Sequence, residues 1–174
     1  MIYYDDEIIR IRNMNESDPQ IFTDAEIAQG WDASTEKLET RLRDAADGKA
    51  VAIVAEWNNE AAGYVSVYPD CKWGAFGGMG YTEIVDFNVL EKFRRKGIGS
   101  KLMDIAESIA SRYSDTVYLG VGLHSGYGSA QRMYIKRGYI PDGSGVWYKD
   151  RVCIPYSECM NDDELNLYLS KKLR

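Results

Sequence analysis

The chain has 174 residues, a length that suits one domain able to bury a core without disulfides or metals. Apolar residues make up 45% and charged residues 28%, the mixture of a globular protein rather than a disordered or fibrous one. The formal net charge of −6 disfavours a nucleic-acid-binding protein, which gathers Lys and Arg, and is compatible with a cationic substrate.

Cysteine usage and the absence of apolar runs predict the compartment. Cys71, Cys153 and Cys159 are an odd number without Cys-x-x-Cys spacing, which disfavours a secreted disulfide framework and a zinc site. His124 is the only histidine, so His-based metal sites and triads are also disfavoured. No segment approaches the roughly 18 consecutive apolar residues of a membrane span. We therefore expect a cytoplasmic protein with no metal, no nucleic-acid partner and no membrane association.

The N-terminal third predicts one strand and two helices. Residues 8–12 alternate Ile and Arg, the pattern of a short strand. A helix is expected over 18–28 with Ser17 as its N-cap, and a second helix after Ser34. Gly48 is the expected stop signal of that second helix.

A hairpin and a third strand follow. Residues 50–57 and 61–68 are rich in β-branched and aromatic side chains and flank a turn-compatible Asn-Asn-Glu, which predicts a hairpin. Residues 70–80 form a glycine-rich loop, and 81–90 read as a strand. Alternation places five side chains of this strand on one face: Tyr81, Glu83, Val85, Phe87 and Val89. Asp86 is expected to face the other way.

The C-terminal half predicts helices and strands in alternation. Helices are expected over 100–112 and 129–137, with a strand at 117–121 between them and strands near 145–154 and 165–169 after them. This order indicates an α/β (mixed α+β) protein with a mixed sheet and helices on its faces, in one domain over residues 1–174.

The turn between the strand at 81–90 and the helix after it is glycine-rich and basic. It reads Phe-Arg-Arg-Lys-Gly-Ile-Gly-Ser, in which Gly97 and Gly99 let the backbone close around a ligand. Free N–H groups and the dipole of the following helix favour phosphate oxygens there, and Arg94, Arg95 and Lys96 add full charges. Walker A and dinucleotide fingerprints do not fit this spacing. An ordinary strand–helix turn is the alternative interpretation.

Two segments together resemble one family. Arg94-x-x-Gly97-x-Gly99 resembles the acetyl-CoA signature of the GNAT (Gcn5-related) N-acetyltransferases, and a stretch with Tyr134 and Gly138 resembles the family's A-x-x-x-Y-x-x-x-G-F/Y segment. The resemblance implies the GNAT fold: a central mixed, mostly antiparallel sheet flanked by helices, with a splayed strand pair that holds acetyl-CoA. It also implies acetyl-CoA as cosubstrate, with no metal.

The resemblance further implies where the cosubstrate binds. Backbone amides of the basic turn would hold the pyrophosphate, and backbone groups of the preceding strand would pair with the pantetheine arm. The N–H of Val89 would polarise the thioester carbonyl. The residues expected to bind the cosubstrate are Phe87, Val89, Arg94, Arg95, Lys96, Gly97, Ile98, Gly99 and Ser100.

Two side chains are candidates for proton transfer. An amine can attack a thioester directly in a ternary complex, so no protein nucleophile is required. Tyr134 matches the family's general acid for the leaving thiolate; a tyrosine packed in the core is the alternative. Glu83 matches the glutamate base of some members; a substrate-binding or structural carboxylate is its alternative. Tyr127 and Gly128 stand where many members have a pantetheine-binding Asn.

The acceptor is the least defined part of this prediction. Trp31, Trp73 and Phe76 lie in segments that family members vary to recognise substrate, although Trp31 is equally compatible with the core. We expect acetyl transfer to a primary amine, with a small cationic amine favoured by the acidic composition. The alternatives are a protein lysine or N-terminus as acceptor, a longer acyl donor, and a non-catalytic acyl-CoA-binding sensor. Assembly into a homodimer is compatible with the sequence.

Overall fold

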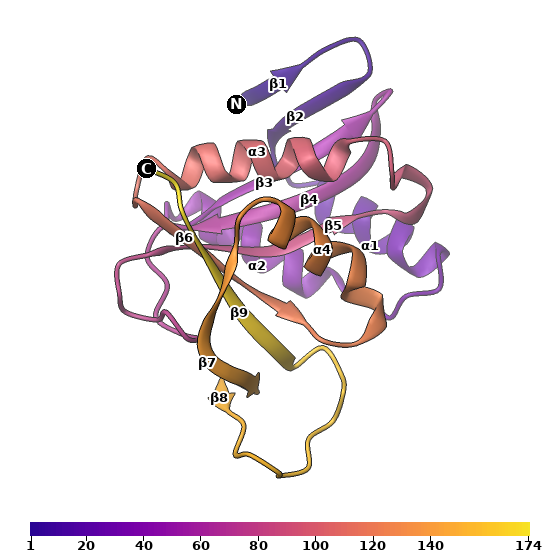
Figure 1. The fold of residues 1–174 in the computed structure, drawn as a ribbon. Coiled ribbons are helices and arrows are strands. Elements are labelled where there is room, and N and C mark those ends of the chain that lie inside the picture. The colour runs from indigo at the N-terminus through magenta and orange to yellow at the C-terminus, as the bar shows by residue number, and fades with distance from the viewer. The chain divides into compact units, whose positions relative to one another are not determined.

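The computed structural model describes residues 1–174 (Figure 1), which divide into two compact units. The first unit comprises residues 1–68 and 84–109, and the second comprises 69–83 and 110–174. Strand β5 (Thr82–Val89) passes from one to the other, because its first two residues belong to the second unit.

The first unit is built on antiparallel strands that follow one another along the chain. They are β1 (Ile2–Asp5), β2 (Ile9–Asn13), β3 (Val51–Trp57) and β4 (Glu60–Tyr68). The end of β5 lies beside the beginning of β4, since the Leu90 N–H donates to the Ala62 carbonyl at 2.9 Å. These two strands therefore also run antiparallel.

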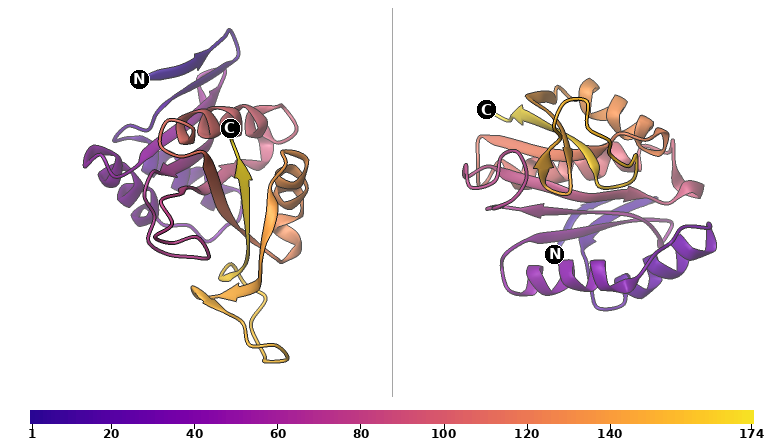
Figure 2. Two further views of the ribbon diagram at one scale, coloured as in Figure 1. Left: turned by 60° about the vertical axis from the view of Figure 1, so that its left-hand side comes forward. Right: turned by 90° about the horizontal axis from the view of Figure 1, so that it is seen from below.

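Three helices cover the sheet of the first unit. They are α1 (Asp18–Ala28), α2 (Thr35–Ala46) and α3 (Ile98–Ala110). Figures 1 and 2 show α1 and α2 on one face of β3 and β4 and α3 on the other. Phe22 and Leu38 fill the first interface, and Leu102 and Met103 of α3 are also buried. Because both faces are covered, β4 is buried from Ala62 to Tyr68 rather than alternating between core and solvent.

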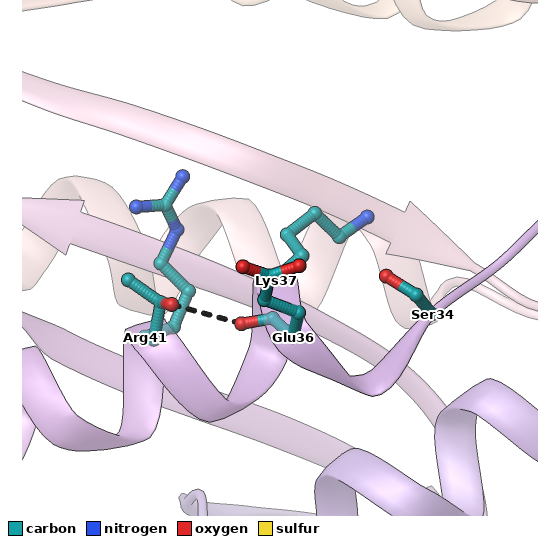
Figure 3. Close-up of a pocket in the computed structure, with 5 residues that line it drawn as sticks. Ser34, Glu36, Lys37 and Arg41 are labelled. Carbon is teal, nitrogen blue, oxygen red and sulfur yellow. Dashed lines mark hydrogen bonds between the residues drawn. The ribbon is translucent and has the colours of Figure 1, made fainter.

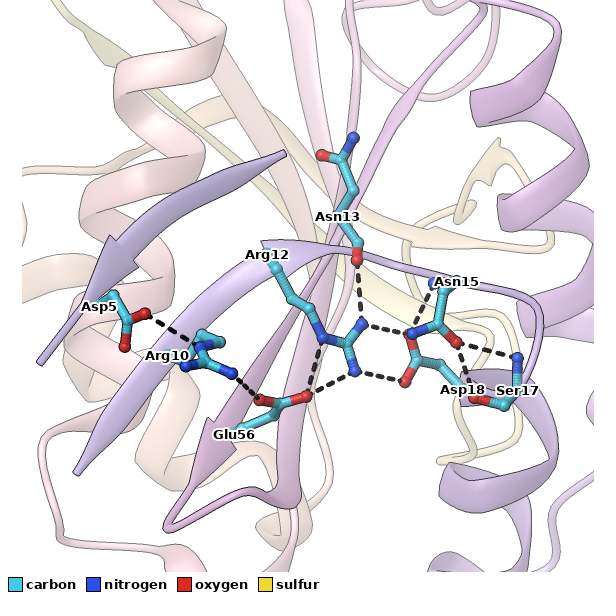
Figure 4. A network of polar contacts seen from close by, with 8 residues as sticks. All are labelled: Asp5, Arg10, Arg12, Asn13, Asn15, Ser17, Asp18 and Glu56. Atoms are coloured by element: carbon cyan, nitrogen blue, oxygen red, sulfur yellow. Dashed lines mark hydrogen bonds and ion pairs between the residues drawn. The ribbon is translucent and has the colours of Figure 1, made fainter. Parts of the chain in front are cut away.

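A charged network joins the start of α1 to β2 and β3 (Figure 4). The Arg12 guanidinium donates to both carboxylate oxygens of the buried Asp18, at 2.7 and 2.9 Å, and to Glu56 at 2.8 Å. Ser17 occupies the predicted N-cap position, but its side chain makes no capping hydrogen bond and donates to Asn15 Oδ1 instead. The ion pair between Arg12 and Asp18, rather than a serine cap, holds this end of the helix.

The second unit continues the sheet from the first residues of β5. Its strands are β6 (Thr116–Gly122), β7 (Ile140–Tyr148), β8 (Arg151–Val152) and β9 (Leu165–Lys172). The strand order is β5-β6-β9-β7-β8, in which β5 and β6 are parallel and the other pairs antiparallel. The parallel register covers only two residue pairs, Thr82 with Val117 and Glu83 with Tyr118. Helix α4 (Gly128–Lys136) follows a short 3-10 turn, η2 (Ser125–Tyr127).

The predicted mixed, mostly antiparallel sheet with flanking helices is confirmed, and α1 has the predicted bounds. Strand β1 was not predicted. It pairs with β2 around a turn in which Asp6 Oδ1 accepts the N–H groups of Ile8 and Ile9, at 2.8 and 2.6 Å. None of the helices is long and apolar enough to cross a membrane.

Candidate active site

The predicted anion-binding turn is an exposed basic loop held between two buried side chains. After β5 the chain forms a 3-10 helix, η1 (Glu91–Phe93), and α3 begins at Ile98. Phe93 is 4% exposed and Ile98 1%, whereas the four residues between them, Arg94 to Gly97, are exposed. The loop therefore presents its backbone and charges to solvent from two fixed ends.

The two glycines of this turn are required for different reasons. Gly97 has φ +83°, a left-handed backbone that side-chain-bearing residues rarely adopt. Gly99 has ordinary backbone angles, but a Cβ there would lie 3.1 Å from Phe87 Cζ. The first α-helical bond recorded at this end joins the Lys101 N–H to the Gly97 carbonyl at 3.1 Å. The N–H groups of the preceding helical residues, Ile98 to Ser100, have no partner within the helix and suit an anion.

Aromatic rings orient two of the three cations of the turn. The Arg94 guanidinium lies 5.4 Å from the Trp31 ring centroid, and its Nε donates to the Val89 carbonyl at 3.2 Å. The Lys96 ammonium lies 4.9 Å from the Trp57 ring. Trp31 is half-buried and contacts the arginine of the basic turn, a role that differs from the substrate contact considered for it.

A pocket of about 370 Å³ opens between the end of α1 and η1. Gln29 closes one side, where its Oε1 accepts the Glu91 N–H at 3.0 Å. The lining residues are Ala25, Ala28, Gln29, Leu90, Glu91 and Lys92. Sequence patterns did not predict this pocket, because it joins segments about 60 residues apart.

Strand β5 is irregular at Asp86, whose φ is +53°. Its carboxylate pairs with Arg41 Nε of α2 at 2.5 Å, and Arg41 also donates to the Tyr68 hydroxyl at 2.9 Å. A left-handed residue interrupts simple alternation along a strand. The inference that alternation alone places Glu83 on the same face as Phe87 therefore does not hold.

One side chain of α1 in the first unit is a buried carboxylate. Glu26 is 5% exposed and accepts hydrogen bonds from the Tyr64 hydroxyl at 2.6 Å and from Asn88 Nδ2 at 2.7 Å. Burial raises the pKa of Tyr64, and the neighbouring Glu26 raises it further. Lys37 Nζ donates to the same hydroxyl at 3.2 Å. The network fixes the side chain of Asn88 near the end of β5.

A second pocket, of about 280 Å³, lies along the N-terminal half of α2 (Figure 3). Its lining residues are Ser34, Glu36, Lys37, Thr40 and Arg41. Lys37 and Arg41 stand one helical turn apart and reach Tyr64 of β4 and Asp86 of β5. Sequence patterns did not predict this polar face.

In the second unit, Glu83 lies in a buried polar cluster. It is 6% exposed, and its neighbours Cys71 and Tyr118 are 2% and 0% exposed. Burial raises the pKa of the Cys71 thiol, and a hydrogen bond with Glu83 raises it further. The structure thus brings Glu83 together with a thiol and a phenol that sequence reasoning did not connect to it.

Tyr134 is a buried residue of α4, 5% exposed. Burial raises its pKa, with a smaller contribution from Tyr127. Its ring packs 5.8 Å from that of Tyr139. Gln131 Nε2 donates to the Gly122 carbonyl at 2.8 Å and ties α4 to β6.

The residues before α4 form a polar contact with the β8–β9 connection. The Tyr127 hydroxyl donates to Asp163 Oδ1 at 2.8 Å, and His124 Nε2 lies 3.0 Å from the same oxygen. The His124 and Tyr127 rings pack edge to face at 4.6 Å. No three His, Cys, Asp or Glu side chains are grouped so that they could hold a metal ion.

The two aromatic residues of the glycine-rich loop differ in environment. Trp73 is 62% exposed. Phe76 packs against Tyr118 and Tyr81, with ring centroids 5.1 and 6.0 Å apart. Phe76 is therefore part of a packed aromatic cluster, whereas the Trp73 ring is available to solvent or to a ligand.

The model of the acetyltransferase (GNAT) family matches residues 11–139. No curated protein sequence matches the chain.

Solved structures share the fold at low sequence identity. An acetyltransferase from Salmonella typhimurium that modifies the N-terminal serine of ribosomal protein L7/L12 has a TM-score of 0.71 at 13% identity, with 100% of each chain covered. Ard1 from Thermoplasma volcanium has a TM-score of 0.69 at 19% identity, covering 96% of this chain and 99% of the other. The ribosomal-protein-S18-alanine N-acetyltransferase from Escherichia coli has a TM-score of 0.67 at 11% identity, covering 95% and 94%.

Proposed function

The chain belongs to the GNAT family of acetyltransferases and is an N-acetyltransferase, and from that premise we propose which residues bind acetyl-CoA and carry out the transfer. The observation that supports the proposal most directly is the basic turn at the start of α3. It combines exposed cations, N–H groups without a partner in the helix, and two glycines at which a side chain would be strained (Gly97) or would press on Phe87 (Gly99).

Acetyl-CoA fits this turn by its chemistry. The pyrophosphate is an anion, and the N–H groups of Ile98 to Ser100 together with Arg95 would receive it. At Gly97 the position of a Cβ faces open space, whereas at Gly99 it would lie 3.1 Å from Phe87 of the strand. We assign Phe87 and Val89 to the pantetheine arm and the Val89 N–H to the thioester carbonyl. When bound, the cosubstrate supplies the activated acetyl group.

Two side chains would move the protons of the reaction. An amine enters mostly as an ammonium ion and must lose a proton before it can attack, and we assign that proton to Glu83. The leaving thiolate must gain a proton, and we assign its donor as the Tyr134 hydroxyl. A tyrosine hydroxyl, with an ordinary pKa of about 10, carries its proton at neutral pH, which is the state a general acid requires.

Two classes of acceptor each have an observation in their favour. The net charge of −6 favours a small cationic amine, such as a polyamine or an aminoglycoside. Two enzymes of similar fold, from Salmonella typhimurium and Escherichia coli, act on ribosomal proteins, which favours the N-terminal amine of a protein. Both acceptors present a primary amine, so the proton transfers are the same.

A thiol-release assay with acetyl-CoA distinguishes the two classes. We expect release of free thiol with one group of amines in a panel of polyamines, aminoglycosides and short peptides with free N-termini. Gly97→Val should slow release at subsaturating acetyl-CoA by weakening binding of the cosubstrate. Tight binding of CoA with no thiol release for any amine of either class would contradict the proposal.

A further inference from the structure

The carboxylate of Glu83 has a fixed neighbour on the adjacent strand. Glu83 of β5 and Tyr118 of β6 are direct partners in the two-residue parallel register. Opposed residues of neighbouring strands point to the same face of a sheet, so the two side chains lie together. Glu83 is 6% exposed and Tyr118 fully buried, and their contact is therefore shielded from water.

The Tyr118 hydroxyl has one proton and several acceptors. It donates to the Trp73 carbonyl at 3.3 Å, a long hydrogen bond, and it also interacts with Glu83 and with the Cys71 thiol. A charged carboxylate is a stronger acceptor than a carbonyl or a sulfur. While Glu83 is ionised, a hydrogen bond from the Tyr118 hydroxyl to the Glu83 carboxylate is therefore more favourable than one to the Trp73 carbonyl.

Packing holds the Tyr118 ring in position. Phe76 lies 5.1 Å away and Tyr168 of β9 lies 6.4 Å away, measured between ring centroids. Gly74 approaches Tyr168 so closely that a Cβ would fall 2.6 Å from its hydroxyl. The glycine-rich loop thus packs on the same aromatic cluster, and the hydroxyl has little freedom to move.

Three titratable groups that interact with Glu83 are neutral donors in their usual state. They are the Cys71 thiol, the Tyr118 hydroxyl and the Tyr168 hydroxyl, each with a pKa raised by burial first and, among the charges, by Glu83. Asp150 is a second carboxylate that acts on Tyr168. Hydrogen bonds from these neutral groups stabilise the charged form of Glu83.

We propose that Tyr118 is the positioning residue for Glu83: it orients the carboxylate and sets the pH range in which that carboxylate can accept a proton from the amine. The proposal rests on the assignment of Glu83 as the base. A donor to an ionised carboxylate stabilises the charged form, so its removal makes the carboxylate bind a proton at higher pH. Tyr118 does not itself take part in proton transfer.

Tyr118→Phe removes the hydroxyl and keeps the ring, so packing with Phe76 and Tyr168 should survive. With saturating acetyl-CoA, we expect the low-pH limb of the kcat/KM profile to move up by about one pH unit. An NMR titration of the Glu83 carboxyl in the free protein should show the same upward shift in pKa. Tyr64→Phe is the matched control, because it removes a buried hydroxyl that donates to another carboxylate, Glu26. Tyr64→Phe should not shift the low-pH limb of the kcat/KM profile.

The Glu83→Gln variant separates this inference from the assignment of the base. It should lower kcat/KM most at low pH, where the amine is protonated, and in that background Tyr118→Phe should change kcat/KM by less than twofold. An unmoved carboxyl pKa in Tyr118→Phe, or a rate reduced equally at every pH, would overturn the positioning role. If Tyr118→Phe shifts the carboxyl pKa but not the pH profile of kcat/KM, Glu83 is not the base. Tyr118 then makes no contribution to the reaction through Glu83.

Discussion

At the scale of single residues, the proposed role of Tyr134 can be tested by removing its hydroxyl alone. The side chain is 5% exposed, and burial raises its pKa. Tyr134→Phe fills nearly the same volume, so the fold and CoA affinity should be retained. We expect kcat to fall by at least about tenfold, because general acid catalysis typically contributes 10²- to 10⁴-fold and water can substitute in part.

The comparison that checks this expectation is kcat against CoA affinity and melting temperature in one variant. Tyr139→Phe is a suitable control, since Tyr139 is a buried tyrosine whose ring lies 5.8 Å from that of Tyr134. It should leave kcat near the wild-type value. Should Tyr134→Phe keep its turnover while its melting temperature falls, Tyr134 is a packing residue and the acid is another group.

At the scale of elements, the basic turn depends on the backbone at its glycines. Gly97→Val forces a β-branched side chain into a left-handed conformation, and Gly99→Val drives a side chain against Phe87. Both variants should weaken CoA binding at least about tenfold, since one lost charge-assisted contact is worth 1.5–3 kcal/mol. Isothermal titration calorimetry measures the effect directly.

A second left-handed glycine provides the control for this experiment. Gly48 follows α2 with φ +73° and, like Gly97, has no atom within 4 Å of the position of a Cβ. Gly48→Val therefore imposes comparable backbone strain outside the turn. It should lower stability and leave CoA affinity unchanged. Equal CoA affinity in the Gly97 and Gly48 variants would contradict the role of the turn.

The start of α1 gives a stability prediction that is independent of catalysis. Asp18 is 1% exposed and accepts two hydrogen bonds from Arg12, while Glu56 on the other side of the guanidinium is more exposed. Asp18→Ala should lower the free energy of unfolding by about 2–3 kcal/mol, because it leaves a partly buried cation without one carboxylate. Glu56→Gln should cost less. Urea unfolding measures both, and a larger loss for Glu56→Gln would contradict this ranking.

Local patterns predicted the elements better than the contacts between them. The helix at 18–28 and the hairpin at 50–68 follow from periodicity and turn residues and are confirmed. The left-handed Asp86 was not predicted, because the β-branched and aromatic residues around it indicate a regular strand. The neighbours of Glu83 could not be predicted from the sequence either, since strand pairing brings Tyr118 to it and loop packing brings Cys71.

At the scale of the whole molecule, the residues assigned to the reaction are divided between the two units. The basic turn belongs to the first unit, whereas Glu83 and Tyr134 belong to the second. Strand β5 contributes residues to both units, since the boundary falls between Glu83 and Ile84. Asp86, with its left-handed backbone, lies on the side of β5 that belongs to the first unit. A substitution at Asp86 therefore acts on a different part of the strand from one at Glu83.

The net charge gives a prediction that separates the two acceptor classes. A chain with a formal charge of −6 attracts a polyamine over long range and does not attract a peptide whose only charge is its N-terminal ammonium to the same degree. Raising the ionic strength from about 0.01 M to 0.15 M shortens the Debye length from about 30 to about 8 Å and removes most of that attraction. For a cationic acceptor, kcat/KM should fall several-fold through KM, with kcat unchanged.

The measurement needs acetyl-CoA at saturation, because salt also weakens binding of the anionic cosubstrate to the basic turn. A monoamine of similar size serves as the matched acceptor, since its rate should depend little on salt. If the polyamine and the monoamine respond equally, long-range attraction does not contribute to acceptor choice. The acidic composition would then give no support to a cationic acceptor, and the N-terminal amine of a protein would be the better candidate.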